Sequence, residues 1–359
     1  MRIDGVESWR ERIPLREPYT IASETFADVD LLFVRIVAGA RVGHGSASPA
    51  PEVTGETVEA AAVAVEAMAS RLHGDEIASA RDLLAALPDV DDAIAGPAAR
   101  AALDMALWDL LAKERGLPLI DLLGRAVAPL PTSVTLGIQP LEDAVRAARE
   151  RVAEGFRALK VKLGRDVGAD VERLASIRAA VGPGIALRTD PNMGYDSAAL
   201  RRFLDDTRAL GLELCEQPVP RGRDDQIALA MRGLDATAPP FVADESLHDL
   251  ADARALVANA RSPYAAWNLK LMKCGGVTPA RTIAALAASH DIGLMWGCND
   301  ESRLSIAGAL HVALASPATR WLDLDGSFDL SRDPARGGFE LVDGCLRTLD
   351  APGLGVELD

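Results

Sequence analysis

Short apolar runs alternate with segments of helical period from about residue 130 onward. The first run, at residues 131–137, precedes a segment whose apolar residues recur every three or four positions, which is typical of an amphipathic helix. Seven further apolar runs follow it, at residues 158–163, 185–190, 212–216, 241–244, 267–270, 294–297 and 321–325. Eight strands alternating with helices favour a parallel (β/α) barrel over an open sheet, since no glycine-rich dinucleotide fingerprint follows any strand.

Residues 1–125 have a different pattern. Alternating strands near residues 2–14, 31–38 and 41–45 precede helices at about 58–72 and 98–113. Turn and strand signals return in the last part of the chain, after the eighth strand. We therefore predict an α+β capping domain of residues 1–125, completed by about 331–359, and a (β/α) barrel catalytic domain of residues 126–330.

Composition excludes several classes of protein. Hydrophobic residues make up 49% of the chain, enough for a large core, and no apolar run approaches the roughly 18 residues of a membrane span. The formal net charge of −15 makes nucleic acid and anionic membranes poor partners. The four cysteines show no disulfide or metal-binding spacing, and the N-terminus lacks a signal peptide's apolar stretch, so we expect a cytoplasmic protein.

Ionisable residues end most of the predicted strands, and barrel enzymes place their catalytic groups at these carboxyl ends. The second strand supplies Lys160 and Lys162, which share one face because alternate side chains of a strand point the same way. The later strands supply, in order, Asp190, Glu216, Asp244, Lys270, Asp323 and Asp325. Burying so many charges without partners or a metal would be costly, so we interpret them as one site.

Three of these carboxylates form a candidate metal site. Asp190, Glu216 and Asp244 come from three adjacent strands, about one βα unit apart. Mg²⁺ prefers carboxylate oxygens and keeps positions for water or substrate, whereas zinc or copper would want histidine or thiolate, which no strand end offers. The sequence therefore predicts a magnesium site.

Five motifs together carry a family resemblance over essentially the whole chain. They are Lys160-Val-Lys162, Asp190-Pro-Asn192, Glu216-Gln-Pro218, Asp244-Glu-Ser246 and Asn268-Leu-Lys-Leu-Met-Lys-Cys-Gly-Gly276. With them the chain resembles the muconate-lactonising branch of the enolase superfamily. The resemblance implies an α/β fold, a (β/α)7β modified TIM barrel under a capping domain formed from both termini. It also implies Mg²⁺ on the three carboxylates, and it leaves a homo-oligomer open.

The resemblance implies an isomerase that moves a proton at the carbon next to a carboxylate. Lys162 and Lys270 would approach this carbon from opposite faces, one as a neutral base and the other as an acid, while Lys160 adds positive charge at the carboxylate. Lys273 also follows the sixth strand, but the family pattern places the acid/base at Lys270. We expect three further residues to orient the metal ligands and lysines: Asn192, Glu245 and Glu301.

Within this branch the chain is most similar to dipeptide epimerases, the group of L-Ala-D/L-Glu epimerase. The distinguishing feature is Asp323-Leu-Asp325, since in that group an Asp-x-Asp at the eighth strand binds the substrate's ammonium group. Two carboxylates at alternate positions suit a cation. We also expect Thr135, on the first strand, to contact the substrate.

Acidic residues in three loops suggest which dipeptide is used. Members that favour an acidic C-terminal residue tend to place an arginine in the first loop, where this chain has Glu24. A second loop supplies Glu52, and Asp300 stands after the seventh strand where related sequences usually have an apolar residue. We hypothesise a substrate with a basic residue. The alternative is that these acids are solvated surface groups.

Other reactions fit the same site. N-acylamino-acid racemase, o-succinylbenzoate synthase and muconate cycloisomerase would use the same lysines and metal, but their substrates bring no ammonium group to Asp323 and Asp325. A Schiff-base aldolase would explain the lysines and leave the three carboxylates without a role. A non-catalytic barrel would need an incomplete site, and no expected catalytic residue is missing.

Overall fold

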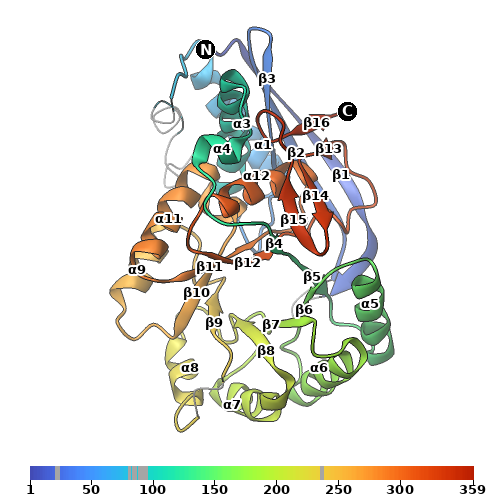
Figure 1. Cartoon of the computed structure of the whole chain (residues 1–359). Coiled ribbons are helices and arrows are strands. Elements are labelled where there is room, and N and C mark those ends of the chain that lie inside the picture. Colours follow the sequence, from blue (N-terminus) through green and yellow to red (C-terminus); the bar gives the residue numbers. More distant parts are fainter. Residues whose placement is uncertain (21–24, 80–81, 83–86, 88–95, 235–237) are drawn as a thin grey trace.

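The structure is a computed structural model that describes residues 1–359 apart from 21–24, 80–81, 83–86, 88–95 and 235–237. The capping domain lies at one end of the molecule with both chain termini, and the barrel lies at the other (Figure 1). An antiparallel sheet of β1 (Gly5–Thr20), β2 (Thr25–Ala38) and β3 (Arg41–Ala47) packs against two helices of the cap, α1 (Val58–Leu72) and α3 (Pro97–Arg115). The short helix α4 (Leu119–Leu123) contacts α3.

Glycines let the cap's long helix lie directly on its sheet. Gly43 and Gly45 face α3 from β3, and a Cβ at Gly45 would lie 1.9 Å from the backbone carbonyl oxygen of Ala102. No side chain fits in that space, so the contact requires glycine.

At the start of α1 the Thr57 hydroxyl accepts a hydrogen bond from the Ala60 amide at 3.2 Å, which caps the helix.

Eight parallel strands form the barrel in the order of the sequence. They are β5 (Ser133–Leu136), β6 (Ala158–Lys162), β7 (Ala186–Asp190), β8 (Leu212–Glu216), β9 (Phe241–Ala243), β10 (Tyr264–Leu269), β11 (Gly293–Gly297) and β12 (Thr319–Asp323). A parallel bridge between Thr132 and Leu322 joins the first strand to the last and closes the ring. The predicted barrel is therefore confirmed, although Asp325 lies beyond the end of the eighth strand.

Helices connect the strands, as the amphipathic segments predicted. They are α5 (Leu141–Ala153), α6 (Val167–Val181), α7 (Ser197–Asp206) with the 3₁₀ turn η1 (Arg208–Leu210), α8 (Asp224–Ala230), α9 (Leu250–Ala258), α10 (Leu271–Cys274), α11 (Val277–Ser289) and α12 (Arg303–Leu314). The sequence of elements is (β/α)7β, the predicted modified TIM barrel. Within the described ranges, every helix is too short or too polar to serve as a membrane span.

The last part of the chain returns to the cap. It contains β13 (Ala335–Gly337), β14 (Phe339–Val342), β15 (Cys345–Thr348) and β16 (Val356–Leu358), and β15 also pairs with β4 (Leu130–Pro131). The Leu354 amide donates to the Asp109 carboxylate of α3 at 2.7 Å, and Pro118 forms a bridge with Gly353. Both termini therefore build the cap, as the fold class predicted.

Helix α3 also attaches the cap to the barrel. Its fully buried Asp104 accepts hydrogen bonds from the backbone amide of Thr278 at 2.9 Å and from the Thr278 hydroxyl at 2.5 Å, which caps the N-terminus of α11. One turn earlier, Arg100 donates to the Gly275 carbonyl at 2.7 Å. These bonds fix the distance between the cap and the ends of the barrel strands.

His311 generates a prediction about pH and stability. It is fully buried in α12, and its Nδ1 accepts a hydrogen bond from the Ile120 amide at 3.0 Å, so the ring is neutral. Burial lowers the pKa of His311 to about 4. The unfolded chain therefore takes up a proton on this ring from about pH 6.5 downward and the folded chain does not, so its stabilising contribution is full above pH 6.5 and falls toward pH 4.

We expect the free energy of unfolding in urea to fall between about pH 7 and pH 4.5 in the wild type. The fall should be up to about 3 kcal/mol larger than in His311→Asn, which has no imidazole at this position. The exposed His290→Asn is the control. Parallel pH profiles for wild type and His311→Asn would contradict the assignment of a neutral buried ring.

Candidate active site

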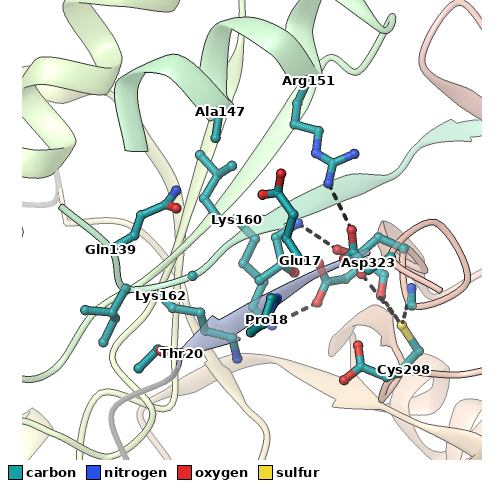
Figure 2. Close-up of a pocket in the computed structure, with 18 of the residues that line it drawn as sticks. Glu17, Pro18, Thr20, Gln139, Ala147, Arg151, Lys160, Lys162, Cys298 and Asp323 are labelled. Atoms are coloured by element: carbon teal, nitrogen blue, oxygen red, sulfur yellow. Dashed lines mark hydrogen bonds and ion pairs between the residues drawn. The ribbon is translucent and has the colours of Figure 1, made fainter. Parts of the chain in front are cut away.

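A cavity of about 340 Å³ opens at the carboxyl ends of the barrel strands. One wall comes from the cap, where Glu17, Pro18 and Thr20 of β1 line it, and the Thr20 carbonyl accepts a hydrogen bond from the Ile138 amide at 2.7 Å. The opposite side comes from the ends of the barrel strands and from α5. Figure 2 shows Lys160, Lys162, Asp323 and Cys298 around the same cavity as the cap residues Glu17, Pro18 and Thr20. The cavity therefore lies between the two domains, over the predicted site.

Lys160 lies at the centre of the buried charges. Its Nζ is 2.6 Å from Glu216 Oε2, 2.8 Å from Asp323 Oδ2 and 3.1 Å from Asp190 Oδ2. The side chain is buried, which by itself lowers its pKa, but these carboxylates reverse the effect and hold the pKa of Lys160 above its usual range. Three carboxylates at this distance favour the ammonium form of Lys160, and its role at the substrate carboxylate stays a prediction.

Lys162 and Lys270 both line the cavity. Lys162 Nζ contacts Asp190 Oδ2 at 2.7 Å, and Lys270 Nζ contacts Asp244 Oδ2 at 3.1 Å. Because β6 and β10 are four strands apart in a closed ring of eight, the two lysines approach the cavity from opposite sides. Burial lowers the pKa of Lys270, but the neighbouring Asp244 carboxylate raises it above its usual range.

Lys273 has a different environment. The short helix α10 carries it beneath the strand ends, where its Nζ contacts Asp244 Oδ1 at 2.5 Å and the carbonyl oxygens of Asp244 at 2.7 Å and Asn268 at 3.2 Å. It is not among the described residues that line the cavity. This geometry suits a structural role for Lys273, as a positive charge beside the Asp244 carboxylate.

The predicted metal ligands are buried and crowded. Asp190, Glu216 and Asp244 end β7 and β8 and follow β9, and each carboxylate is almost inaccessible to solvent. Burial and the Asp190 charge raise the pKa of Glu216 to about 8, while the lysines keep the pKa of Asp190 and Asp244 below its usual range against the effect of burial. Four lysines contact these three carboxylates, so the raised pKa of Glu216 comes first of all from its burial.

A divalent cation would bind the same buried oxygens. The donors are hard carboxylate oxygens, which suit Mg²⁺, and three further buried oxygens around them have no hydrogen-bond partner in the described part of the chain: Asn192 Oδ1, Glu245 Oε2 and Asn268 Oδ1. In the same part of the chain no three acidic, histidine or cysteine side chains already form a metal cage, and lysine ammonium groups contact the carboxylates instead. The donor set fits Mg²⁺, with lysine and metal competing for the same oxygens.

The three residues expected to orient the site lie around it. The Asn192 amide hydrogen-bonds to Asp190 Oδ1 at 2.9 Å, and its side chain donates to Glu245 Oε1 at 3.4 Å. Burial raises the pKa of Glu245 and of Glu301 to about 7. Glu301 accepts a hydrogen bond from the Asn299 amide at 2.9 Å, which shapes the loop after β11.

Both residues of the Asp-x-Asp pair line the cavity, Asp323 at the end of the eighth strand and Asp325 just beyond it. Asp323 accepts hydrogen bonds from Ser133 at 2.5 Å and Lys160 at 2.8 Å, whereas Asp325 accepts one from the backbone amide of Thr135 at 2.6 Å. Thr135 thus contacts the pair, and it also lines the cavity. Burial and the Asp323 charge raise the pKa of Asp325.

The three acids of the specificity hypothesis have different positions. Asp300 lines the cavity, and its carbonyl accepts a hydrogen bond from Ser48 at 2.6 Å. Glu52 is exposed in a turn and is not among the described residues that line the cavity. Glu24 lies outside the described residues. The part that these acids play in specificity stays a prediction.

Sequence reasoning missed several residues that shape the site. Gln217, with a left-handed φ of 29°, accepts hydrogen bonds from the amides of Asp244 and Ser246 at 3.0 and 3.1 Å and thereby fixes the loop after β9. The Glu216-Gln-Pro218 motif was the available signal. Asp329 pairs with Arg151 at 2.9 Å on the cavity wall. It follows no strand end, so no sequence signal pointed to it.

Two family models cover most of the chain. Residues 4–124 match the mandelate racemase / muconate lactonizing enzyme N-terminal domain, and residues 143–359 match the enolase C-terminal domain-like model. Among curated proteins, the chain is 48% identical to an L-Lys-D/L-Arg epimerase of Methylococcus capsulatus and 45% identical to one of Desulforapulum autotrophicum, each over 99% of both chains.

A solved structure agrees with these sequence matches. The dipeptide epimerase from Methylococcus capsulatus, in complex with Mg and the dipeptide L-Arg-D-Lys, superposes with a TM-score of 0.91 at 48% identity over 99% of each chain. The similarity spans both the cap and the barrel, so it covers every wall of the cavity.

The charge cluster generates a prediction about metal binding. Mg²⁺ at about 100 times its dissociation constant should stabilise the wild type by about 2.7 kcal/mol and raise its melting temperature. Asp190→Asn removes one hard ligand and should lose most of this rise, measured by thermal unfolding with and without EDTA. Asp225→Asn, an exposed acid, is the control. An unchanged Mg²⁺ response in Asp190→Asn would exclude Asp190 as a ligand.

Proposed function

The chain belongs to the mandelate racemase / muconate lactonizing enzyme family of the enolase superfamily, and from this we propose that it is a Mg²⁺-dependent dipeptide epimerase. It inverts the α-carbon next to the dipeptide's carboxylate by a 1,1-proton transfer. The observation that carries the proposal is the pair of lysines, Lys162 and Lys270, which reach one cavity from opposite sides of the barrel.

The residues of this chain divide the chemistry among them. Lys162 and Lys270 hold and move the α-proton, one accepting it on one face of the carbon while the other donates on the opposite face. Lys270 Nζ lies 3.1 Å from Asp244 Oδ2, and this carboxylate raises the pKa of Lys270 against the effect of burial, which suits the donor role. The ammonium group of Lys160 stabilises the negative charge that develops on the substrate carboxylate, and Mg²⁺ held by Asp190, Glu216 and Asp244 would add to this.

The substrate's free ammonium group binds at Asp323 and Asp325. These carboxylates line the cavity beside the two lysines, so a dipeptide lying between them has its C-terminal α-carbon at the lysines and its N-terminus at the acids. This feature favours a dipeptide over the N-acylated and succinylated substrates of the alternative reactions, which carry no positive charge there to pair with buried carboxylates.

We further propose that the dipeptide is basic. Two relatives that are 48% and 45% identical are named L-Lys-D/L-Arg epimerases, and the cavity wall of this chain carries Glu17 and Asp300 in addition to the Asp-x-Asp pair. A lysine or arginine side chain would meet complementary charge there.

The four free cysteines suit a reducing compartment, which supports a cytoplasmic location.

Lysine variants test the proton transfer. In D₂O with Mg²⁺, the wild type should convert L-Lys-L-Arg to a mixture of epimers with one deuterium at the arginine α-carbon, read by mass spectrometry. Lys162→Ala and Lys270→Ala should each lose epimerisation by about a thousandfold or more, but each should retain exchange of one stereoisomer, since one base remains on one face. The control is Arg146→Ala, which is exposed. Exchange of both stereoisomers by either variant would contradict the two-base assignment.

An acid on the cavity wall tests the basic preference. Asp300→Asn should lower kcat/KM about tenfold for L-Lys-L-Arg and much less for L-Ala-L-Ala, because only the basic dipeptide loses a charge partner. The measurement is kcat/KM for both dipeptides with both proteins. Equal losses for the two substrates would show that Asp300 shapes the loop without reading charge.

A further inference from the structure

The carboxylate pair of the eighth strand is held by residues that none of the catalytic motifs contain. Asp323 has both oxygens engaged, Oδ1 by the Ser133 hydroxyl at 2.5 Å and Oδ2 by Lys160 at 2.8 Å. Ser133 is fully buried inside the barrel, at the start of β5. It reaches Asp323 because β5 and β12 are neighbours in the closed ring.

A buried arginine fixes the direction of the Ser133 hydroxyl. Arg188 of β7 donates to Ser133 Oγ at 3.0 Å and to the Leu322 carbonyl at 2.5 Å, and its Nε pairs with Glu213 at 2.7 Å. Since Ser133 Oγ accepts from Arg188, its single proton is available for Asp323. Arg188 is 3% exposed, and burying a guanidinium group is costly unless all of its partners are in place.

Asp325 is held from the other side. It lies past the end of β12, where the Thr135 amide binds Oδ2 at 2.6 Å and Cys298 Sγ lies 3.7 Å from Oδ1. The same sulfur is 3.3 Å from the Asp323 carbonyl and accepts from the Gly326 amide at 3.3 Å. Cys298 therefore contacts the backbone on both sides of Asp325 as well as its carboxylate. Burial and the Asp325 charge hold the thiol pKa above its usual range, so the sulfur keeps its proton.

We propose that Ser133 and Cys298 are positioning residues that hold Asp323 and Asp325 in line for the ammonium group of the substrate. Ser133, directed by Arg188, orients the first carboxylate, and Cys298 orients the second. The inference rests on the proposed dipeptide substrate, because the ammonium group is what the pair receives. Each carboxylate is thereby fixed before binding, so less rotational entropy is lost when the substrate arrives.

Substrate pairs that differ only in the ammonium group give the first test. L-Lys-L-Arg is compared with ε-aminocaproyl-L-arginine, which lacks the α-ammonium group of the lysine residue. Cys298→Ala should raise KM for the dipeptide about threefold and Ser133→Ala about tenfold, with kcat within about twofold. Ser133→Ala removes a hydrogen bond to the Asp323 carboxylate, and Cys298→Ala removes the contacts of the sulfur with the backbone on both sides of Asp325 and its longer contact with Asp325 Oδ1. Neither should change kcat/KM for the analogue. Cys298→Ser keeps a donor and should restore the wild-type KM.

A double-mutant cycle gives the second test. If Cys298 acts through Asp325, then Cys298→Ala should have no further effect on KM in an Asp325→Asn background. The control is Cys345→Ala, a half-buried cysteine of β15 outside the cavity. Equal losses for dipeptide and analogue, or additive losses in the cycle, would overturn the positioning role while wild-type epimerisation of dipeptides stands. A wild type that incorporates no deuterium into any dipeptide would overturn the proposed function as well.

Discussion

The site depends on one buried ammonium group, that of Lys160, which lies among the carboxylates of Asp190, Glu216 and Asp323. Carboxylates buried this close repel one another. Without Lys160, the Glu216 and Asp323 carboxylates would lose the ammonium group that both contact, whereas Asp190 would keep Lys162. Even with Lys160, the pKa of Glu216 is raised to about 8 by burial and by Asp190. Four lysines contact the carboxylates of the site, so a divalent cation there would compete with ammonium groups for the same oxygens.

Closure of the barrel makes this cluster possible. The bridge between Thr132 and Leu322 joins strands that are far apart in the chain, so that Ser133 and Thr135 can hold Asp323 and Asp325. The same ring places β6 opposite β10, which separates the two lysines across the cavity. The order of the strands in the closed ring therefore determines which charged side chains are in contact and which lie on opposite sides of the cavity.

The cap completes the cavity from outside. Its β1 covers the strand ends, and the loop at Ser48 is joined to the loop after β11 by hydrogen bonds with Asp300 and Asn299. Asp104 and Arg100 of α3 tie the cap to the start of α11, so the cavity wall and the catalytic groups are parts of one framework. A lid fixed in this way keeps water from the buried charges and strengthens their interactions.

The amino-acid sequence was enough to predict the barrel and the meeting of lysines and carboxylates at its strand ends. Alternating apolar runs and helical segments predict parallel strands, and parallel strands bring their carboxyl ends to one side, so that Lys160, Asp190 and Glu216 had to converge wherever the ring closed. The motifs around these residues indicated the family, and the Asp323-Leu-Asp325 pattern predicted a binding site for the substrate's ammonium group. These are local patterns of period and spacing, which a single chain displays directly.

Only the tertiary structure decided which similar residues face the cavity. Lys270 and Lys273 both follow β10, but the turn of α10 places Lys273 under Asp244 while Lys270 reaches the cavity. Glu52 and Asp300 are both loop acids, and only Asp300 lines the wall in the described part of the chain. Ser133 and Cys298 carry no catalytic pattern at all. Their contacts depend on distances between segments remote in sequence, and these exist only once the ring is closed.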